Sequence, residues 1–158
     1  MIKLPRTIKT VITDFDGILT DNCVYIDSDG KMSRKINFRD VMGLSILSKN
    51  GYRIIIISGE KNKAIDIIAE KFQIETFQDI REKIEVLESV IAKYNLSDEE
   101  FVYIGDDVND YDSLCRAKYA VTVPGAVNKI KEIPNIQMTE TYSGEGAFRE
   151  IADALVIN

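Results

Sequence analysis

The sequence contains no histidine among its 158 residues. A catalytic triad that uses histidine is therefore excluded, and acid–base chemistry must rely on Asp, Glu, Lys, Tyr or Cys. Only two cysteines are present, Cys23 and Cys115, and they lie far apart without the spacing of a metal site. We therefore expect reduced thiols and a cytoplasmic location.

The chain also lacks a long apolar run and a block of basic residues. No run approaches the roughly 20 residues needed to span a bilayer, and residues 1–6 lack the apolar stretch of a signal peptide. The formal net charge of −6 argues against nucleic acid or an anionic membrane as a partner. The length and the 45% hydrophobic content predict a single domain, residues 1–158, with a buried core.

The chain is organised around its first apolar run, residues 8–14, which ends in Asp14 and is followed by Asp16 and Gly17. Such a run is typical of a buried strand. Residues i and i+2 of a strand point the same way, so both aspartates would lie close together at its tip. Gly17 permits the chain to bend there. Two such carboxylates repel unless a cation or a proton lies between them; the alternative is a solvated turn, where Asp and Gly are common.

Further apolar runs alternate with amphipathic segments. The pattern predicts strands at 52–57, 74–77, 101–104, 119–123 and 136–138, and helices at 41–49, 62–72, 80–94, 109–117, 126–131 and 147–156. A hairpin is predicted over 23–38 around the turn Asp27–Gly30, and Asp40 is expected to cap the next helix. The alternation predicts an α/β fold, a Rossmann-like three-layer αβα arrangement with a mainly parallel sheet and the hairpin as a small flap.

Polar residues follow three of the predicted strands. Ligands of parallel sheets bind at the carboxyl ends of the strands, so we expect a site at this edge. The residues placed there are Asp14, Asp16, Ser58, Asp106 and Asp107. Carboxylates select a hard cation, most plausibly Mg²⁺. One carboxylate can attack a phosphoryl group as a nucleophile, and another can act as acid and base.

Three further positions have two readings each. Ser58 either caps a helix or binds a phosphoryl oxygen, and the two roles are compatible. Lys83 is predicted in the first turn of a helix, where a cation opposes the macrodipole. It is therefore expected to face a carboxylate or an anion, unless it is simply solvated. Arg39 is either a surface charge or a contact for an anionic substrate.

In order along the chain, Asp14–Gly17, Ser58, Lys83 and Gly105–Asp107 resemble the four motifs of the haloacid dehalogenase superfamily. The resemblance covers nearly the whole chain. It implies that Asp14 is the nucleophile, that Asp16 is the general acid and base, and that Ser58 and Lys83 position the phosphoryl group.

The same resemblance implies a metal site. Asp106 would bind Mg²⁺ together with Asp14 and the backbone carbonyl of Asp16. Asp107 and Asp110 would support either the metal or the lysine, and the sequence does not rank these two residues.

The resemblance narrows to one group of the superfamily. A hairpin and one helix fill the segment between the first two motifs, which leaves no room for a cap domain. The hairpin turn, residues 38–43 and residues 144–150 resemble the 3-deoxy-octulosonate 8-phosphate phosphatases. This implies a homotetramer whose hairpins assemble centrally, with a neighbouring subunit closing each site. Arg39 and Arg149 would contact a phosphorylated 2-keto-3-deoxy sugar acid, Arg149 from its own or the next subunit.

One departure from that group concerns the substrate. Gly59, Glu60 and Lys61 are expected to contact it, and many octulosonate phosphatases have Arg in place of Glu60. A glutamate there resembles the related nonulosonate 9-phosphate phosphatases, which act on nine-carbon, sialic-acid-like sugars. The resemblance thus implies a Mg²⁺-dependent phosphatase that uses an aspartyl-phosphate intermediate. Its substrate would be an eight-carbon acid of lipopolysaccharide synthesis or a nine-carbon acid of the sialic-acid type.

Two other functions fit parts of the pattern. A phosphorelay receiver also combines an acidic pair, a Ser or Thr and a Lys, but its lysine follows a late strand rather than preceding the second acidic cluster. A catalytically inert relative that serves as an assembly subunit is the other alternative, although all four motifs are intact.

Overall fold

A computed structural model of the protein describes residues 2–157. Among these residues six strands form one sheet in the order β5-β4-β1-β6-β7-β8, and every neighbouring pair is parallel. The strands of this sheet are β1 (Thr10–Thr13), β4 (Arg53–Ile57), β5 (Glu75–Phe77), β6 (Phe101–Ile104), β7 (Tyr119–Thr122) and β8 (Gln137–Met138). The predicted parallel sheet is confirmed.

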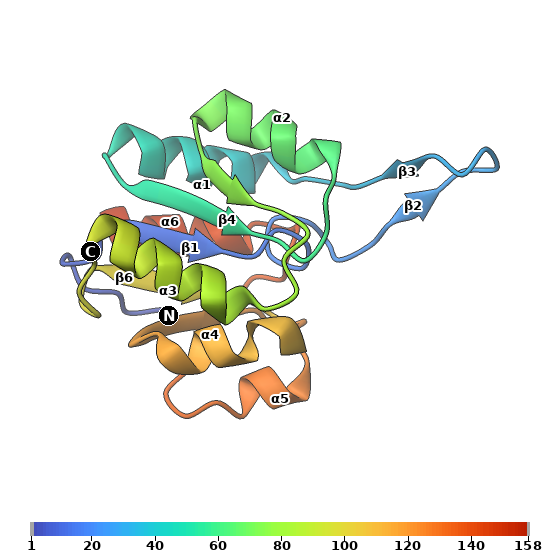
Figure 1. The fold of residues 1–158 in the computed structure, drawn as a ribbon. Helices are drawn as coiled ribbons and strands as arrows, with labels where there is room; N and C mark the ends of the chain where they lie inside the picture. Colours follow the sequence, from blue (N-terminus) through green and yellow to red (C-terminus); the bar gives the residue numbers. More distant parts are fainter. Residues whose placement is uncertain (1, 158) are drawn as a thin grey trace.

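Helices cover both faces of the sheet. They are α1 (Phe38–Lys49), α2 (Lys63–Phe72), α3 (Lys83–Tyr94), the 3₁₀ turn η1 (Val108–Asp110), α4 (Tyr111–Arg116), α5 (Asn128–Lys131) and α6 (Ala147–Val156). Helices α1 and α6 pack together on one face, and α3 and α4 pack together on the other (Figure 1). The three-layer αβα arrangement is therefore also as predicted.

The central strands owe their position to their composition. In β4, residues 54–57 are all isoleucine and all buried, because helices cover the strand from both sides. All four residues of β1 and of β6 are likewise buried. The three strands that precede the predicted site residues thus form the rigid middle of the sheet.

The predicted hairpin consists of β2 (Tyr25–Ile26) and β3 (Met32–Ser33), paired antiparallel. It projects away from the body at the end of the sheet where β1 and β4 terminate (Figure 1). Its side chains lie largely in solvent, with Ile26 67% and Met32 61% exposed. Cys23, before β2, and Cys115, in α4, are free and exposed thiols.

The predicted cap of α1 is wrong. The helix begins three residues earlier than expected, and Asn37 caps it by accepting a hydrogen bond from the backbone N–H of Arg39. Asp40 lies buried inside the helix and accepts hydrogen bonds from the N–H groups of Gly146 and Arg149, both at 3.1 Å. It thereby joins α1 to the start of α6.

In α2, Ile65 is buried and Ile67 is 65% exposed. One other local expectation changes. The helix predicted over 109–117 is divided into η1 and the short α4. No helix within residues 2–157 is long and apolar enough to cross a membrane.

Candidate active site

Three neighbouring strands deliver polar residues to one pocket. Asp14, Ser58 and Asp106 follow β1, β4 and β6, which lie side by side in the sheet. The pocket has a volume of about 380 Å³. Its lining includes the predicted Asp14, Asp16, Ser58, Gly59, Glu60, Asp106 and Asp107, together with Asn22, Ile80, Arg81 and Asn109, which sequence reasoning had not singled out.

Lys83 lies buried beneath this pocket, in the first turn of α3. Its ammonium nitrogen is 2.8 Å from Asp14 Oδ2 and 2.9 Å from Asp110 Oδ1, so it has the carboxylate partners that its position predicted. Burial alone would lower the pKa of Lys83, but the two carboxylates outweigh burial and raise it. The lysine therefore stays charged and fixes one oxygen of Asp14.

Asp14 is held at both oxygens. Its Oδ1 accepts a 2.6 Å hydrogen bond from the N–H of Phe15, while Oδ2 faces Lys83. Burial and the nearby Asp110 raise the pKa of Asp14 well above its usual range, and Lys83 opposes this rise. Such a carboxylate is rigidly oriented and gains from any further positive charge placed beside it.

The structure separates the roles of Asp107 and Asp110. Asp110 is fully buried, and its Oδ1 accepts from Lys83 and the Tyr103 hydroxyl. Its Oδ2 accepts from the N–H groups of Asp106 and Asp107. Asp107 is exposed and caps η1 through the N–H of Val108. The geometry thus makes Asp110 the partner of the lysine, with both oxygens already occupied.

Asp106 and Asp16 each have one carboxylate oxygen without a hydrogen-bond partner among the described residues. Asp106 Oδ1 and Asp16 Oδ2 are buried and accept no hydrogen bond from the residues that the structure describes. Burial, with the charges of Asp110 and Asp107, raises the pKa of Asp106 from 3.8 to about 7. Ligand oxygens of Asp14, Asp106 and Asp110 all lie within 4.8 Å of one another. Unsatisfied buried carboxylate oxygens in this arrangement fit a hard, oxygen-binding divalent cation.

Gly17 makes this close arrangement possible. Its φ of +84° is a backbone conformation that L side chains rarely adopt. A Cβ added to Gly17 would lie 2.1 Å from Asp106 Oδ2. The bend expected after Asp16 is therefore present, and the space of a missing side chain is filled by the carboxylate of Asp106.

Ser58 lies at the floor of the pocket, 1% exposed. Its hydroxyl accepts a 3.2 Å hydrogen bond from the N–H of Glu60. It does not cap α2, because Asn62 does so. The N–H of Ile80 donates to the Ser58 carbonyl at 3.1 Å, which fastens the loop before α3 to the loop after β4.

Arg34 is a residue that sequence reasoning missed. It follows β3, and its Nε lies 2.9 Å from Asp16 Oδ1, with the arginine side chain only 8% exposed. Nothing in the composition of the hairpin marks this contact, because it depends on the angle at which the hairpin returns to the body.

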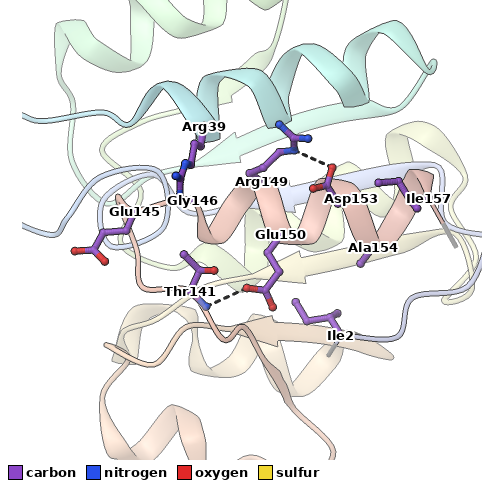
Figure 2. A pocket seen from close by; sticks show the side chains of 10 residues that line it. All are labelled: Ile2, Arg39, Thr141, Glu145, Gly146, Arg149, Glu150, Asp153, Ala154 and Ile157. Carbon is purple, nitrogen blue, oxygen red and sulfur yellow. Dashed lines mark hydrogen bonds and ion pairs between the residues drawn. The ribbon is translucent and has the colours of Figure 1, made fainter.

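Two arginines that were predicted to contact the substrate do not line the acidic pocket. Arg39 and Arg149 line a second pocket of about 370 Å³ beside α6, rather than the acidic pocket (Figure 2). The guanidinium of Arg149 donates to Asp153 Oδ1 at 2.8 Å. Lys61 is exposed and lines neither pocket. The assignment of these three residues to the substrate stays a prediction.

Comparisons with known proteins agree with the motif reading. A family model described as haloacid dehalogenase-like hydrolase matches residues 81–151. The 3-deoxy-D-manno-octulosonate 8-phosphate phosphatase of Salmonella typhi is 28% identical over 154 residues, which cover 96% of this chain and 81% of the relative.

Solved structures show the same relationship. A Legionella pneumophila protein assigned to subfamily III A of the HAD superfamily hydrolases is 31% identical, with a TM-score of 0.90 and 96% and 84% of the two chains covered. The 3-deoxy-D-manno-octulosonate 8-phosphate phosphatase of Moraxella catarrhalis was solved with magnesium, phosphate and KDO. It is 26% identical, with a TM-score of 0.90 and 96% and 87% coverage.

These relatives favour a hydrolase over a phosphorelay receiver. The chain belongs to the haloacid dehalogenase superfamily, is similar to 3-deoxy-D-manno-octulosonate 8-phosphate phosphatases within it, and is a hydrolase of phosphoric monoesters.

Proposed function

We propose that the protein is a Mg²⁺-dependent phosphatase that removes the terminal phosphate of a 2-keto-3-deoxy sugar acid through an aspartyl-phosphate intermediate. The observation that carries this proposal is that Asp14 and Asp106 meet in one pocket while Lys83 pairs with Asp14 from beneath it. The names of the relatives support the phosphate ester and the sugar acid.

The metal site would use two carboxylates and one backbone carbonyl. Asp14, Asp106 and the backbone carbonyl of Asp16 would hold the cation, and Asp110 would support Lys83. When bound, Mg²⁺ offsets negative charge on the phosphoryl oxygens and on the attacking carboxylate. The unpartnered oxygen of Asp106 supplies the structural reason for expecting it.

The first chemical step uses Asp14. A carboxylate oxygen of Asp14 forms a bond to phosphorus while the bond from phosphorus to the sugar oxygen breaks. Lys83 and the Ser58 hydroxyl stabilise charge on the phosphoryl oxygens as it moves. Asp16, in its protonated form, gives its proton to the departing sugar oxygen.

The second step regenerates the enzyme. The carboxylate of Asp16 takes a proton from a water molecule, whose oxygen attacks the phosphorus of the aspartyl-phosphate. The bond between Asp14 and phosphorus breaks, which releases inorganic phosphate. Asp16 is protonated again and ready for the next substrate.

We assign the sugar to the mouth of the pocket. Glu60 and Arg81 line the pocket at its exposed rim, so a polar substrate meets both charges. Glu60 can accept hydrogen bonds from sugar hydroxyls, and its resemblance to the glutamate of nonulosonate 9-phosphate phosphatases favours a nine-carbon acid over the eight-carbon acid. The test is phosphate release with Mg²⁺ from octulosonate 8-phosphate and from nonulosonate 9-phosphates.

The expected result is a higher kcat/KM for the nine-carbon acids, reversed or reduced in Glu60→Arg. Equal preference in the two proteins would remove Glu60 as the determinant of specificity. Failure of the wild type on every sugar acid and on p-nitrophenyl phosphate would contradict the phosphatase itself and favour an inert assembly subunit.

The assembly we propose is a homotetramer of single-domain chains, residues 1–158, in the cytoplasm. Exposed apolar side chains on the hairpin, Tyr25, Ile26 and Met32, support contact between hairpins. In such an assembly, Arg39 or Arg149 of one subunit would lie near the acidic pocket of its neighbour. Two exposed free thiols support a reducing compartment.

A further inference from the structure

The hairpin reaches the acidic pocket through one buried side chain. Arg34 lies directly after β3, and its Nε is 2.9 Å from Asp16 Oδ1. The arginine side chain is 8% exposed and that of Asp16 is 23% exposed. An ion pair so far withdrawn from water is little screened, and it holds both side chains in one geometry.

A second donor meets the same oxygen. The Thr20 hydroxyl donates to Asp16 Oδ1 at 3.1 Å. The hydroxyl oxygen in turn accepts from the N–H groups of Gly17 and Asn22, which directs its hydrogen toward the carboxylate. Two donors from different segments therefore fix Oδ1, one from the hairpin and one from the loop after β1.

The other oxygen of Asp16 is left for chemistry. Oδ2 is buried and has no hydrogen-bond partner among residues 2–157. A carboxyl group that is saturated on one oxygen and bare on the other presents a single atom for proton transfer. General acid–base catalysis depends on such placement, because the proton must move over one hydrogen bond.

Resting on the proposed function, in which Asp16 is the general acid and base, we propose that Arg34 is the positioning residue of that acid. It acts from the hairpin by holding Oδ1, so that Oδ2 meets the oxygen of the leaving group. Arginine suits the task because its planar guanidinium keeps a fixed direction where a flexible ammonium would not. The contact between Arg34 and Asp16 thereby sets the geometry of proton transfer.

The neighbouring Lys35 offers a matched control. Its side chain is 54% exposed and its ammonium lies 3.1 Å from Asp21 Oδ2. It thus ties the same limb of the hairpin to the same loop, but through a carboxylate outside the proposed chemistry. Lys35→Ala tests tethering of the hairpin, whereas Arg34→Gln tests the orientation of Asp16.

The experiment compares two leaving groups. p-Nitrophenolate departs without a proton, whereas the sugar oxygen of an alkyl phosphate needs one. The value of kcat/KM reports only the steps up to transfer of the phosphoryl group to Asp14. In Arg34→Gln we expect kcat/KM to fall about 10- to 100-fold for the sugar-acid phosphate that the wild type hydrolyses fastest. For p-nitrophenyl phosphate it should stay within about threefold, and Lys35→Ala should change neither value.

A second readout uses the return step, in which Asp16 acts as base. If this step becomes slow in Arg34→Gln, p-nitrophenolate appears in a rapid burst of one equivalent per active site before steady turnover. Arg34→Lys keeps the charge. The difference between its losses of kcat/KM on the two substrates should be smaller than in Arg34→Gln. If Arg34→Gln does not fold, as judged by its thermal melt, the lysine variant decides.

Equal losses on both substrates, or no loss, would overturn the role of Arg34 while leaving the phosphatase intact. A wild type that hydrolyses neither ester, or an Asp14→Asn variant that hydrolyses both, would overturn the proposed function instead. The two failures are thus distinguishable within one set of measurements.

Discussion

Two regions of this molecule depart from the usual distribution of polar and apolar residues, in opposite directions. The pocket at the ends of β1, β4 and β6 buries Asp14, Asp106, Asp110 and Lys83. The hairpin, in contrast, exposes its apolar side chains. Burying a charge is costly unless it is paired, and exposed apolar surface is a common mark of contact with another molecule.

This difference indicates which kind of partner each region would bind. Lys83 pairs with Asp14 and Asp110 but not with Asp106, so negative charge is in excess at the pocket and a cation is the expected complement. The two short strands of the hairpin project from the body and expose apolar side chains, so the complement expected there is another protein surface. We expect the stability that the pocket confers to depend on metal and pH. The contacts of the hairpin should depend on protein concentration.

The largest expected effect comes from the nucleophile. Asp14→Asn keeps the shape of the side chain but removes the attacking carboxylate, so kcat should fall by at least about 10⁴-fold. The thermal melt should stay at or above that of the wild type, because one buried negative charge is gone. Asp112→Asn, at an exposed position in α4, is the control. Activity retained in Asp14→Asn would mean that the buried charge serves structure alone.

The next effect links metal to pH. The folded protein binds a proton at Asp106 up to about pH 7, whereas the unfolded chain releases it near 3.8. The folded state therefore holds more protons between these values, and metal-free stability falls as the pH rises through them. The shift corresponds to about 4 kcal/mol in the free energy of unfolding. The raised pKa of Asp14 adds a loss of the same sign.

Mg²⁺ binds the ionised carboxylate of Asp106, so the stabilisation by Mg²⁺ should increase as the pH rises and the metal-free protein becomes less stable. Urea titrations at about pH 5 and about pH 8, with chelator or with saturating Mg²⁺, measure both quantities. Asp106→Asn should lose most of the dependence on pH and on metal. Stabilisation by Mg²⁺ that is equal at the two pH values would argue against a site built on Asp106.

The hairpin offers a sharper comparison with a surface position. Ile26→Asp places a charge on the hairpin, and Ile67→Asp places one on α2 at a side chain of nearly equal exposure, 67% against 65%. Loss of the hairpin contact should raise the dissociation constant of the assembly at least about 100-fold. Light scattering over a range of concentrations should show smaller particles only for Ile26→Asp. Equal masses for both variants would leave the hairpin without a partner.

The smallest effect concerns a buried carboxylate that is fully satisfied. Asp40 accepts hydrogen bonds from two backbone N–H groups at the start of α6. It is buried like the carboxylates of the pocket, but its oxygens already have partners and it should not bind a cation. Asp40→Asn leaves one N–H without an acceptor and should cost about 1–2 kcal/mol of stability. Chemical denaturation measures this, with the exposed Glu70→Gln as control. Sensitivity of Asp40→Asn to Mg²⁺ beyond that of the wild type would contradict the distinction.

Much of the pocket was predictable because topology alone brings the strand ends together. The sequence predicted a carboxylate or another anion beside Lys83, with a solvated lysine as the alternative, and the structure supplies Asp14 and Asp110. It did not rank Asp107 against Asp110, since both follow the same strand. The turn of η1 decides this, by pointing Asp110 inward and leaving Asp107 as its cap.

The failures share another physical cause. Asn37 and Asp40 are both good cap residues, and only the packing of α6 against α1 shows which one caps the helix and which one is buried. Arg34 was missed because its contact depends on how the hairpin returns to the body. Local patterns predict elements well, but they do not fix the relative placement of distant segments.

The two free thiols give this molecule a built-in pair of labelling sites. Cys23 lies at the base of the hairpin and Cys115 lies on α4, and both are exposed. A nitroxide attached to each would report the separation of hairpin and body by pulsed electron resonance, without any added cysteine. The same two labels would count hairpins in an assembly, because every additional copy adds a further set of spin-to-spin distances.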